Sequence, residues 1–145
     1  MSEKIIIGIA GLGTVGSGLV EMLQKNHDDI LRRSGREFVI KAVAVHNLNK
    51  KRDLPEGVTL TGNPLDLAND PEIQVVVELM GGTGAARELI LAAMKNGKSV
   101  VTANKALLAE YGKEIFALAR EKNVSLGYEA SAAGAIAVIE PLRDS

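Results

Sequence analysis

The sequence has no cysteine and no tryptophan, few other aromatic residues, and no excess of either charge. Without cysteine, the chain has no disulfide framework, no thiolate zinc site and no thiol nucleophile. Its 17 basic and 18 acidic residues give a net charge of −1, which predicts neither a nucleic-acid partner nor a charged membrane contact. No apolar run approaches the roughly 20 residues that cross a bilayer, and the N-terminus does not resemble a signal peptide. These absences predict a soluble cytoplasmic protein.

Short apolar runs alternate with longer stretches of helical periodicity along the 145 residues. The apolar runs predict six strands, at residues 5–10, 38–46, 58–61, 73–79, 99–102 and 124–128. The periodic stretches predict helices at residues 14–34, 64–70, 85–96, 107–122 and 135–142. Because parallel strands need crossover connections, this alternation predicts an α/β fold with a doubly wound, mostly parallel sheet.

A glycine-rich turn joins the first predicted strand to the first predicted helix. Its residues, Gly11-Leu12-Gly13-Thr14-Val15-Gly16, have the spacing G-x-G-x-x-G. In this spacing the first glycine permits a tight turn, the second lets a pyrophosphate approach the backbone, and the third lets the helix pack against the strand. The helix N-terminus offers free N–H groups to phosphate oxygens. We therefore expect a Rossmann-type dinucleotide-binding domain rather than an ordinary structural turn.

The end of the second predicted strand bears on which dinucleotide binds. An acidic residue there would bind the ribose 2′-hydroxyl of NAD, but the chain has His46 and Asn47, followed by Lys50, Lys51 and Arg52. This favours NADP, or the use of both cofactors, with His46 and Lys50 as candidate ligands. The alternative is that the basic residues are only a solvated loop.

Three further segments follow predicted strands, and the carboxyl ends of parallel strands are where ligands bind. Gly82 and Thr83 lie in the turn after residues 73–79 and form a candidate cofactor contact or a flexible turn. Lys105 follows residues 99–102 between apolar neighbours, and its cation is suited to polarising a carbonyl or stabilising an alkoxide. Glu129 follows the last strand, where a carboxylate among small residues either holds a hard cation or caps a helix.

Four motifs occur in a fixed order along almost the whole chain. They are GLGTVGSG at residues 11–18, VVELMGGTGA at 76–85, VVTANKALL at 100–108 and YEASAAGAI at 128–136. Together they resemble the N-terminal cofactor-binding domain of homoserine dehydrogenases. The resemblance implies NADPH- or NADH-dependent reduction of L-aspartate 4-semialdehyde to L-homoserine, on the route to threonine and methionine.

The resemblance also implies roles for individual residues. The pyrophosphate would be held by residues of the glycine turn, namely Gly11, Gly13, Thr14, Val15 and Gly16. Thr83 and Lys105 would lie beside the nicotinamide ribose, and Lys105 would also reach the reacting oxygen as a catalytic residue. A monovalent cation such as Na⁺ would be bound by Glu129, Ala132, Gly134 and Ile136. His46 stands where the family often has arginine, and Ala135-Ile136-Ala137 where it usually has Gly-Ile-Pro.

The expected organisation is a dinucleotide-binding domain at residues 1–130, with residues 131–145 starting the connection to a substrate and dimerisation domain that is absent from this chain. The full-length enzyme would be a homodimer, and this chain alone would be inactive. The absence of cysteine argues against aspartate-semialdehyde dehydrogenase, which acylates a cysteine. A dinucleotide-sensing regulatory module without catalysis is the alternative, and Lys105 favours the enzyme.

Overall fold

The computed structural model describes residues 3–49, 52 and 54–128. Six strands lie in this part of the chain: β1 (Glu3–Ala10), β2 (Arg36–Ala44), β3 (Thr59–Thr61), β4 (Val75–Glu78), β5 (Ser99–Thr102) and β6 (Leu126–Tyr128). The helices described are α1 (Thr14–Lys25), α2 (His27–Ser34), α3 (Leu65–Asn69), α4 (Gly84–Lys95) and α5 (Lys105–Lys122). All six predicted strands are therefore confirmed, with ends that differ by a few residues.

The strands form one parallel sheet in the order β3-β2-β1-β4-β5-β6. Strands β1, β2 and β3 follow one another from the middle of the sheet to one edge. The chain then returns through α3 to β4, which lies on the other side of β1, and β5 and β6 continue to the opposite edge. The order reverses between β1 and β4, and a reversal of this kind opens a crevice beyond the carboxyl ends of the strands. The predicted doubly wound sheet is confirmed, and every described strand pair is parallel.

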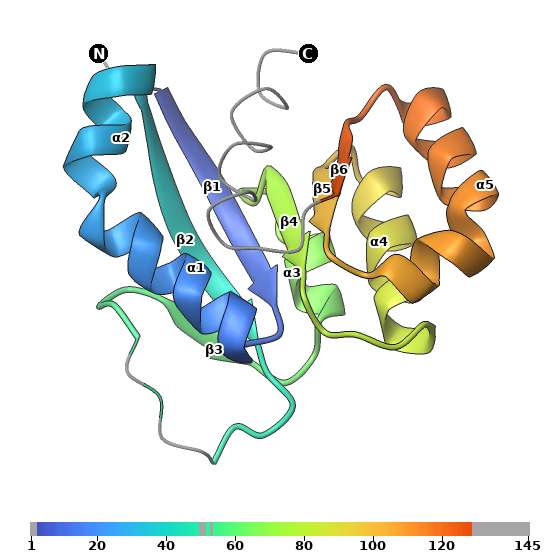
Figure 1. Ribbon diagram of the computed structural model, residues 1–145, viewed down its shortest axis with the longest axis horizontal. Coiled ribbons are helices and arrows are strands. Elements are labelled where there is room, and N and C mark those ends of the chain that lie inside the picture. Colours follow the sequence, from blue (N-terminus) through green and yellow to red (C-terminus); the bar gives the residue numbers. More distant parts are fainter. Residues whose placement is uncertain (1–2, 50–51, 53, 129–145) are drawn as a thin grey trace.

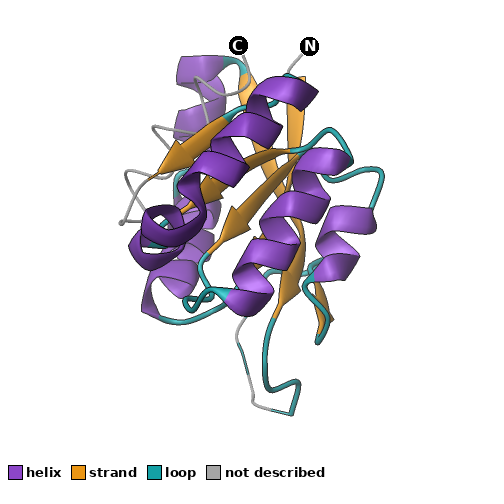
Figure 2. Cartoon of the chain, turned by 90° about the vertical axis from the view of Figure 1, so that its right-hand side faces the viewer, coloured by secondary structure: helices purple, strands orange, loops and turns teal. Residues whose placement is uncertain are grey.

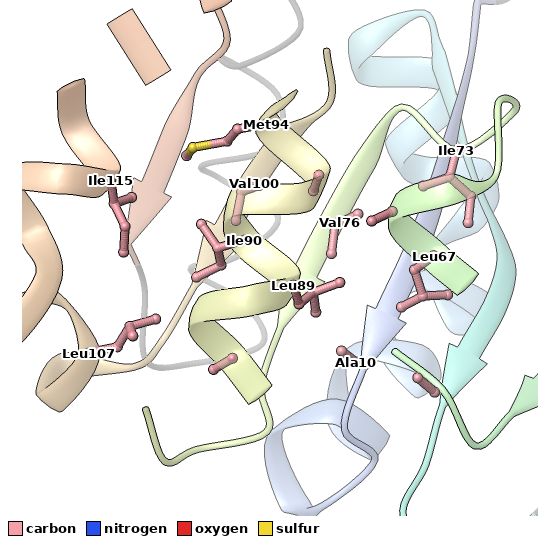
Figure 3. Close-up of a cluster of buried hydrophobic side chains, with 14 of the residues drawn as sticks. Ala10, Leu67, Ile73, Val76, Leu89, Ile90, Met94, Val100, Leu107 and Ile115 are labelled. Carbon is pink, nitrogen blue, oxygen red and sulfur yellow. The ribbon is translucent and has the colours of Figure 1, made fainter. Parts of the chain in front are cut away.

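Helices cover both faces of the sheet (Figure 1). On one face, α1 buries Leu19 and Leu23 against alternate residues of β1 and β4. On the other face, α3, α4 and α5 pack on the remaining residues of the strands, and the view in Figure 2 looks onto this layer. Figure 3 shows its centre, where Leu89 and Ile90 of α4 lie between Val76 and Leu107. The alternation of strand side chains thus divides the core into two layers.

The stretch predicted as one helix over residues 14–34 is two helices. The chain breaks at Asn26, whose φ and ψ of −107° and 17° lie outside the helical region. Its side-chain amide donates to the carbonyl of Met22, so it satisfies the end of α1 instead of continuing it. The helical periodicity of apolar residues continues past Asn26, because the one-residue break leaves Ile30 packed against the same core cluster as α1.

Helix α5 begins at Lys105, two residues before the predicted start at residue 107. The difference moves Lys105 from a connecting loop into the first turn of a helix. Although apolar residues stand on both sides of it in the sequence, Lys105 is exposed. The neighbour that is buried is Leu107, which packs into the core beside Ile115.

The predicted helix at residues 135–142 lies outside the described residues. Within the part that is described, no helix is long and apolar enough to cross a membrane.

Candidate cofactor site

The glycine turn adopts the conformation that its spacing predicts. Gly11 has a φ of +98°, and a Cβ on it would lie 2.7 Å from the carbonyl oxygen of Leu79. A Cβ on Gly16 would overlap the carbonyl oxygen of Gly11, so the first turn of α1 packs directly on the end of β1. A Cβ on Gly13 would meet no atom within 4 Å. Two glycines are therefore needed by the fold, whereas Gly13 faces open space that suits a phosphate group.

The N-terminus of α1 has no side-chain cap. Gly13 is its N-cap residue, Thr14 and Val15 begin the helix, and its first turn contains no acidic residue. Helix α4, which starts at the same edge of the sheet, also has no side-chain hydrogen bond at its N-cap Thr83. Uncapped N–H groups and the positive ends of two helix dipoles thus face the crevice, as an anionic ligand requires.

A cavity of about 540 Å³ opens at this edge. It extends from the glycine turn past the ends of β2 and β4 to the start of α4, and its lining residues are Gly11, Leu12, Gly13, Ala44, Val45, His46, Arg52, Gly62, Pro64, Leu79, Met80 and Ala85. The volume is in the range of small-molecule sites. None of these described lining residues carries a carboxylate, so nothing acidic among them would repel a phosphate.

Two nitrogen-rich side chains line the cavity beyond β2. His46 is exposed, and Arg52 is partly buried. Arg52 Nη1 donates to the carbonyl of Asn47 at 2.5 Å, which directs the guanidinium back toward the strand end. The sequence proposed His46 and Lys50 as ligands. The structure places His46 and Arg52 together, and Lys50 lies outside the described residues.

Gly82, Thr83 and Lys105 form a second group at the ends of β4 and β5. Gly81 and Gly82 have φ values of +80° and +73°, which turn the chain from β4 into α4. Asn104 links this turn to α5, because its side-chain amide donates to the carbonyl of Gly82 at 2.5 Å. The same side chain accepts from the backbone N–H of Leu107 at 3.0 Å and caps the helix that Lys105 begins.

Sequence reasoning missed Glu78 and Asn104, which hold this second group in place. Glu78 ends β4 and is fully buried, with Thr102 and the backbone of Met80 donating to its carboxylate. The signal was present, since a carboxylate at the end of an apolar strand is costly to bury without hydrogen-bond partners.

The proposed cation ligands Glu129, Ala132, Gly134 and Ile136 all lie outside the described residues. Within those that are described, no group of three or more His, Cys, Asp or Glu residues is arranged to hold a metal ion.

Comparison with known proteins agrees with this geometry. Residues 11–129 match the family model described as the NAD-binding domain of homoserine dehydrogenase. The homoserine dehydrogenase of Pseudomonas aeruginosa is 50% identical over 143 residues, covering 98% of this chain and 32% of that protein. The Neisseria gonorrhoeae enzyme is 47% identical over 142 residues, covering 98% and 33%.

A solved structure of homoserine dehydrogenase from Thiobacillus denitrificans is 51% identical, with a TM-score of 0.83 over 90% of this chain and 30% of that one. The chain thus spans about a third of the length of the relatives that it matches. These matches carry the name of an enzyme, and none of them favours the dinucleotide-sensing alternative. The chain belongs to the homoserine dehydrogenase family and carries that family's NAD-binding domain.

Proposed function

We propose that this chain binds the cofactor of an enzyme that reduces L-aspartate 4-semialdehyde to L-homoserine, and that it prefers NADPH to NADH. The observation that carries the proposal is the cavity in which the uncapped glycine turn meets His46 and Arg52. When bound, the cofactor supplies a hydride to the aldehyde carbon, and the aldehyde oxygen takes a proton. The chain's own residues hold and orient the cofactor.

The preference for NADPH follows from the charges at the end of β2. The Arg52 guanidinium, oriented by Asn47, suits the 2′-phosphate, and His46 adds a second nitrogen donor from the same side of the cavity. No described lining residue offers the carboxylate that would favour an unmodified ribose.

Titration of the chain with each cofactor by calorimetry tests this preference. We expect NADPH to bind at least about tenfold more tightly than NADH, or about 1.4 kcal/mol. Arg52→Ala should weaken NADPH binding and leave NADH unchanged, whereas Arg33→Ala, on the exposed side of α2, should affect neither. Tighter binding of NADH would refute the preference, and failure of both cofactors to bind at millimolar concentration would refute the proposal itself.

Lys105 is our candidate catalytic residue. Its exposed ammonium group begins α5 beside the Gly82 turn, at the same edge of the sheet as the glycine turn. A cation at this point would stabilise negative charge that develops on the aldehyde oxygen. Gly82 and Thr83 would contact the nicotinamide ribose.

Steady-state kinetics test the role of Lys105 in an enzyme that joins this chain to a substrate domain. Lys105→Ala should lower kcat by about 100-fold or more and change cofactor affinity little, since removing one such donor typically has an effect of this size. Lys113→Ala, an exposed lysine two turns along the same helix, is the control. Unchanged turnover would exclude Lys105 from the reaction and favour a dinucleotide sensor.

Four further features of the proposal rest on the sequence and the family resemblance. Residues 1–130 form the cofactor domain and residues 131–145 begin the connection to the substrate domain. The enzyme is a cytoplasmic homodimer. Na⁺ is bound by Glu129 with Ala132, Gly134 and Ile136. If so, replacing Na⁺ by a bulky organic cation should lower activity, and Glu129→Gln should abolish that response.

A further inference from the structure

Glu78 is a charged residue in an otherwise apolar strand. It ends β4 after three valines and is completely removed from solvent. It lies on the sheet face covered by α4 and α5, beside Thr102 of β5, with which it is in register. Burying a carboxylate costs several kcal/mol unless hydrogen bonds replace its water. A residue of this kind in so small a strand calls for an explanation beyond packing.

Both carboxylate oxygens of Glu78 accept hydrogen bonds. Oε1 accepts from the hydroxyl of Thr102 at 2.6 Å, and Oε2 accepts from the backbone N–H of Met80 at 2.8 Å. Thr102 has a single hydroxyl proton, which it donates to Glu78, so its oxygen is the acceptor for the backbone N–H of Asn104 at 3.0 Å. Glu78 thus accepts hydrogen bonds through both of its carboxylate oxygens.

Asn104 closes these contacts into a ring. Its side-chain amide donates to the carbonyl of Gly82, two residues beyond Met80. The ring therefore runs from Glu78 through Thr102 and Asn104 to Gly82, and back along the chain to Met80. We call these four residues and Met80 the Glu78 ring.

The turn that the Glu78 ring holds has few packing contacts of its own. Gly81 and Gly82 are exposed, and a Cβ on either would meet no atom within 4 Å. Because glycine can adopt many backbone conformations, packing alone does not fix this turn. The hydrogen bonds of the ring therefore set its position. The same ring fixes the start of α5, because Asn104 also caps the helix that Lys105 begins.

We infer that Glu78 is a positioning residue that holds the Gly82–Thr83 turn and Lys105 in one arrangement for the nicotinamide half of the cofactor. This inference rests on the proposed function. A dinucleotide with its pyrophosphate at α1 extends to both sides of the crevice, and the adenosine half lies toward β2. The Glu78 ring lies on the other side, at β4 and β5. It therefore acts on one half of the cofactor.

Two ligands separate the halves experimentally: NADPH, and 2′-phospho-ADP, which keeps the adenosine half and the pyrophosphate but lacks the nicotinamide and its ribose. In Glu78→Gln, the new amide nitrogen either faces the N–H of Met80, with which it cannot bond, or donates to the hydroxyl oxygen of Thr102, whose proton then has no acceptor in the ring. Calorimetry on the chain should show NADPH affinity reduced about tenfold and 2′-phospho-ADP affinity changed less than twofold.

Thr102 supplies a second test that does not depend on how well Glu78→Gln folds. Thr102→Val keeps the shape of the side chain, removes the hydroxyl and should reproduce the selective loss of NADPH affinity. Thr102→Ser keeps the hydroxyl and should retain the wild-type ratio of the two affinities. Lys98→Met, which alters a buried polar residue at the opposite end of β5, is the matched control and should also retain that ratio.

The outcomes separate this inference from the proposed function. Wild-type chain that binds neither ligand would overturn the proposed function and this inference with it. Normal wild-type binding, with both affinities unchanged or equally reduced in Glu78→Gln and Thr102→Val, would overturn the inference alone. A change in the ratio of the two ligand affinities in Thr102→Val and Glu78→Gln, but not in Thr102→Ser or Lys98→Met, would support it.

Discussion

The two ends of the sheet differ in whether the polar groups around them find partners within the chain. At the amino end, Lys98 is buried just before β5, and its ammonium donates to the carbonyls of Asp70 and Ile73 at 2.6 and 2.7 Å. Burial lowers the pKa of Lys98 below its ordinary value. At the carboxyl end, the starts of α1 and α4 have no side-chain cap, and a cavity lies beside them.

The difference extends to the charges around each end. Lys41 bonds to Asp70 and Glu72 beside the turn that Lys98 holds, and its hydrogen bond lowers the pKa of Asp70. The amino end thus satisfies its polar groups within the chain and serves stability. The carboxyl end leaves the backbone donors at the starts of α1 and α4 free for a ligand. Helix α5 is the exception at this end, because Asn104 of the Glu78 ring caps it and so fixes Lys105.

The largest effect, on both stability and binding, is expected at Gly16, which lies at the carboxyl end of the sheet and is also needed by the fold. Gly16→Ala places a methyl group on the carbonyl oxygen of Gly11, which must move. We expect a loss of about 3 kcal/mol in the free energy of unfolding, together with loss of NADPH binding. Urea denaturation and calorimetry measure the two effects. Wild-type stability would show that α1 does not need this close approach.

A smaller effect, on stability alone, is expected at the amino end. Lys98→Met keeps the apolar stem and leaves the carbonyls of Asp70 and Ile73 without their donor, at a cost of about 2 kcal/mol. Urea denaturation should show this loss, while NADPH affinity stays within twofold of wild type. A matching loss of affinity would contradict the division of roles between the two ends.

Gly13→Ala should show the reverse pattern, with function lost and stability retained. Gly13 has a φ of −81°, which alanine adopts freely, and its Cβ would meet no protein atom within 4 Å. The change should cost less than about 1 kcal/mol of stability, since glycine is only a modest N-cap. NADPH affinity should fall more than about tenfold, or 1.4 kcal/mol, because the methyl group occupies the place of the pyrophosphate. Equal affinity would place the phosphates elsewhere.

The smallest effect concerns the pH dependence of stability, at the start of α2. Hydrogen bonds to the carboxylates of Asp28 and Glu37 raise the pKa of His27 above its ordinary 6.5. A raised folded-state pKa gives stability that is complete below pH 6.5 and is lost as the pH rises through the folded value. His27 is partly exposed, so less than about 1 kcal/mol is involved.

Urea denaturation at pH 6 and pH 8.5 tests this pH dependence. His27→Gln should reduce the stability difference between the two pH values. An identical pH dependence in His27→Gln would contradict the assignment.

Much of the fold could be predicted because its signals are local. The six apolar runs and the glycine turn each show in a few consecutive residues, and the turn's spacing carries its own mechanism. The break at Asn26 could not be predicted, because it depends on a side chain that bonds its own helix end. The exposure of Lys105 depends on how α5 packs, with Leu107 turned inward in its place.

The candidate site divides in the same way. Gly11, Gly13 and Gly16 follow from spacing, whereas Arg52 reaches the cavity through a contact with Asn47 that spacing does not indicate. Glu78 and Thr102 are 24 residues apart in sequence, and only the pairing of β4 with β5 makes them neighbours.

By itself, the sequence determined the class of fold, the glycine turn and the resemblance to one enzyme family. Each of these is encoded in local periodicity or in motifs of fewer than a dozen residues. Only the tertiary structure decided which polar groups meet at each end of the sheet, because that depends on strand register and on which face each side chain occupies. The Glu78 ring is the clearest case, since its members come from two strands and two turns that are distant in sequence and adjacent in the sheet.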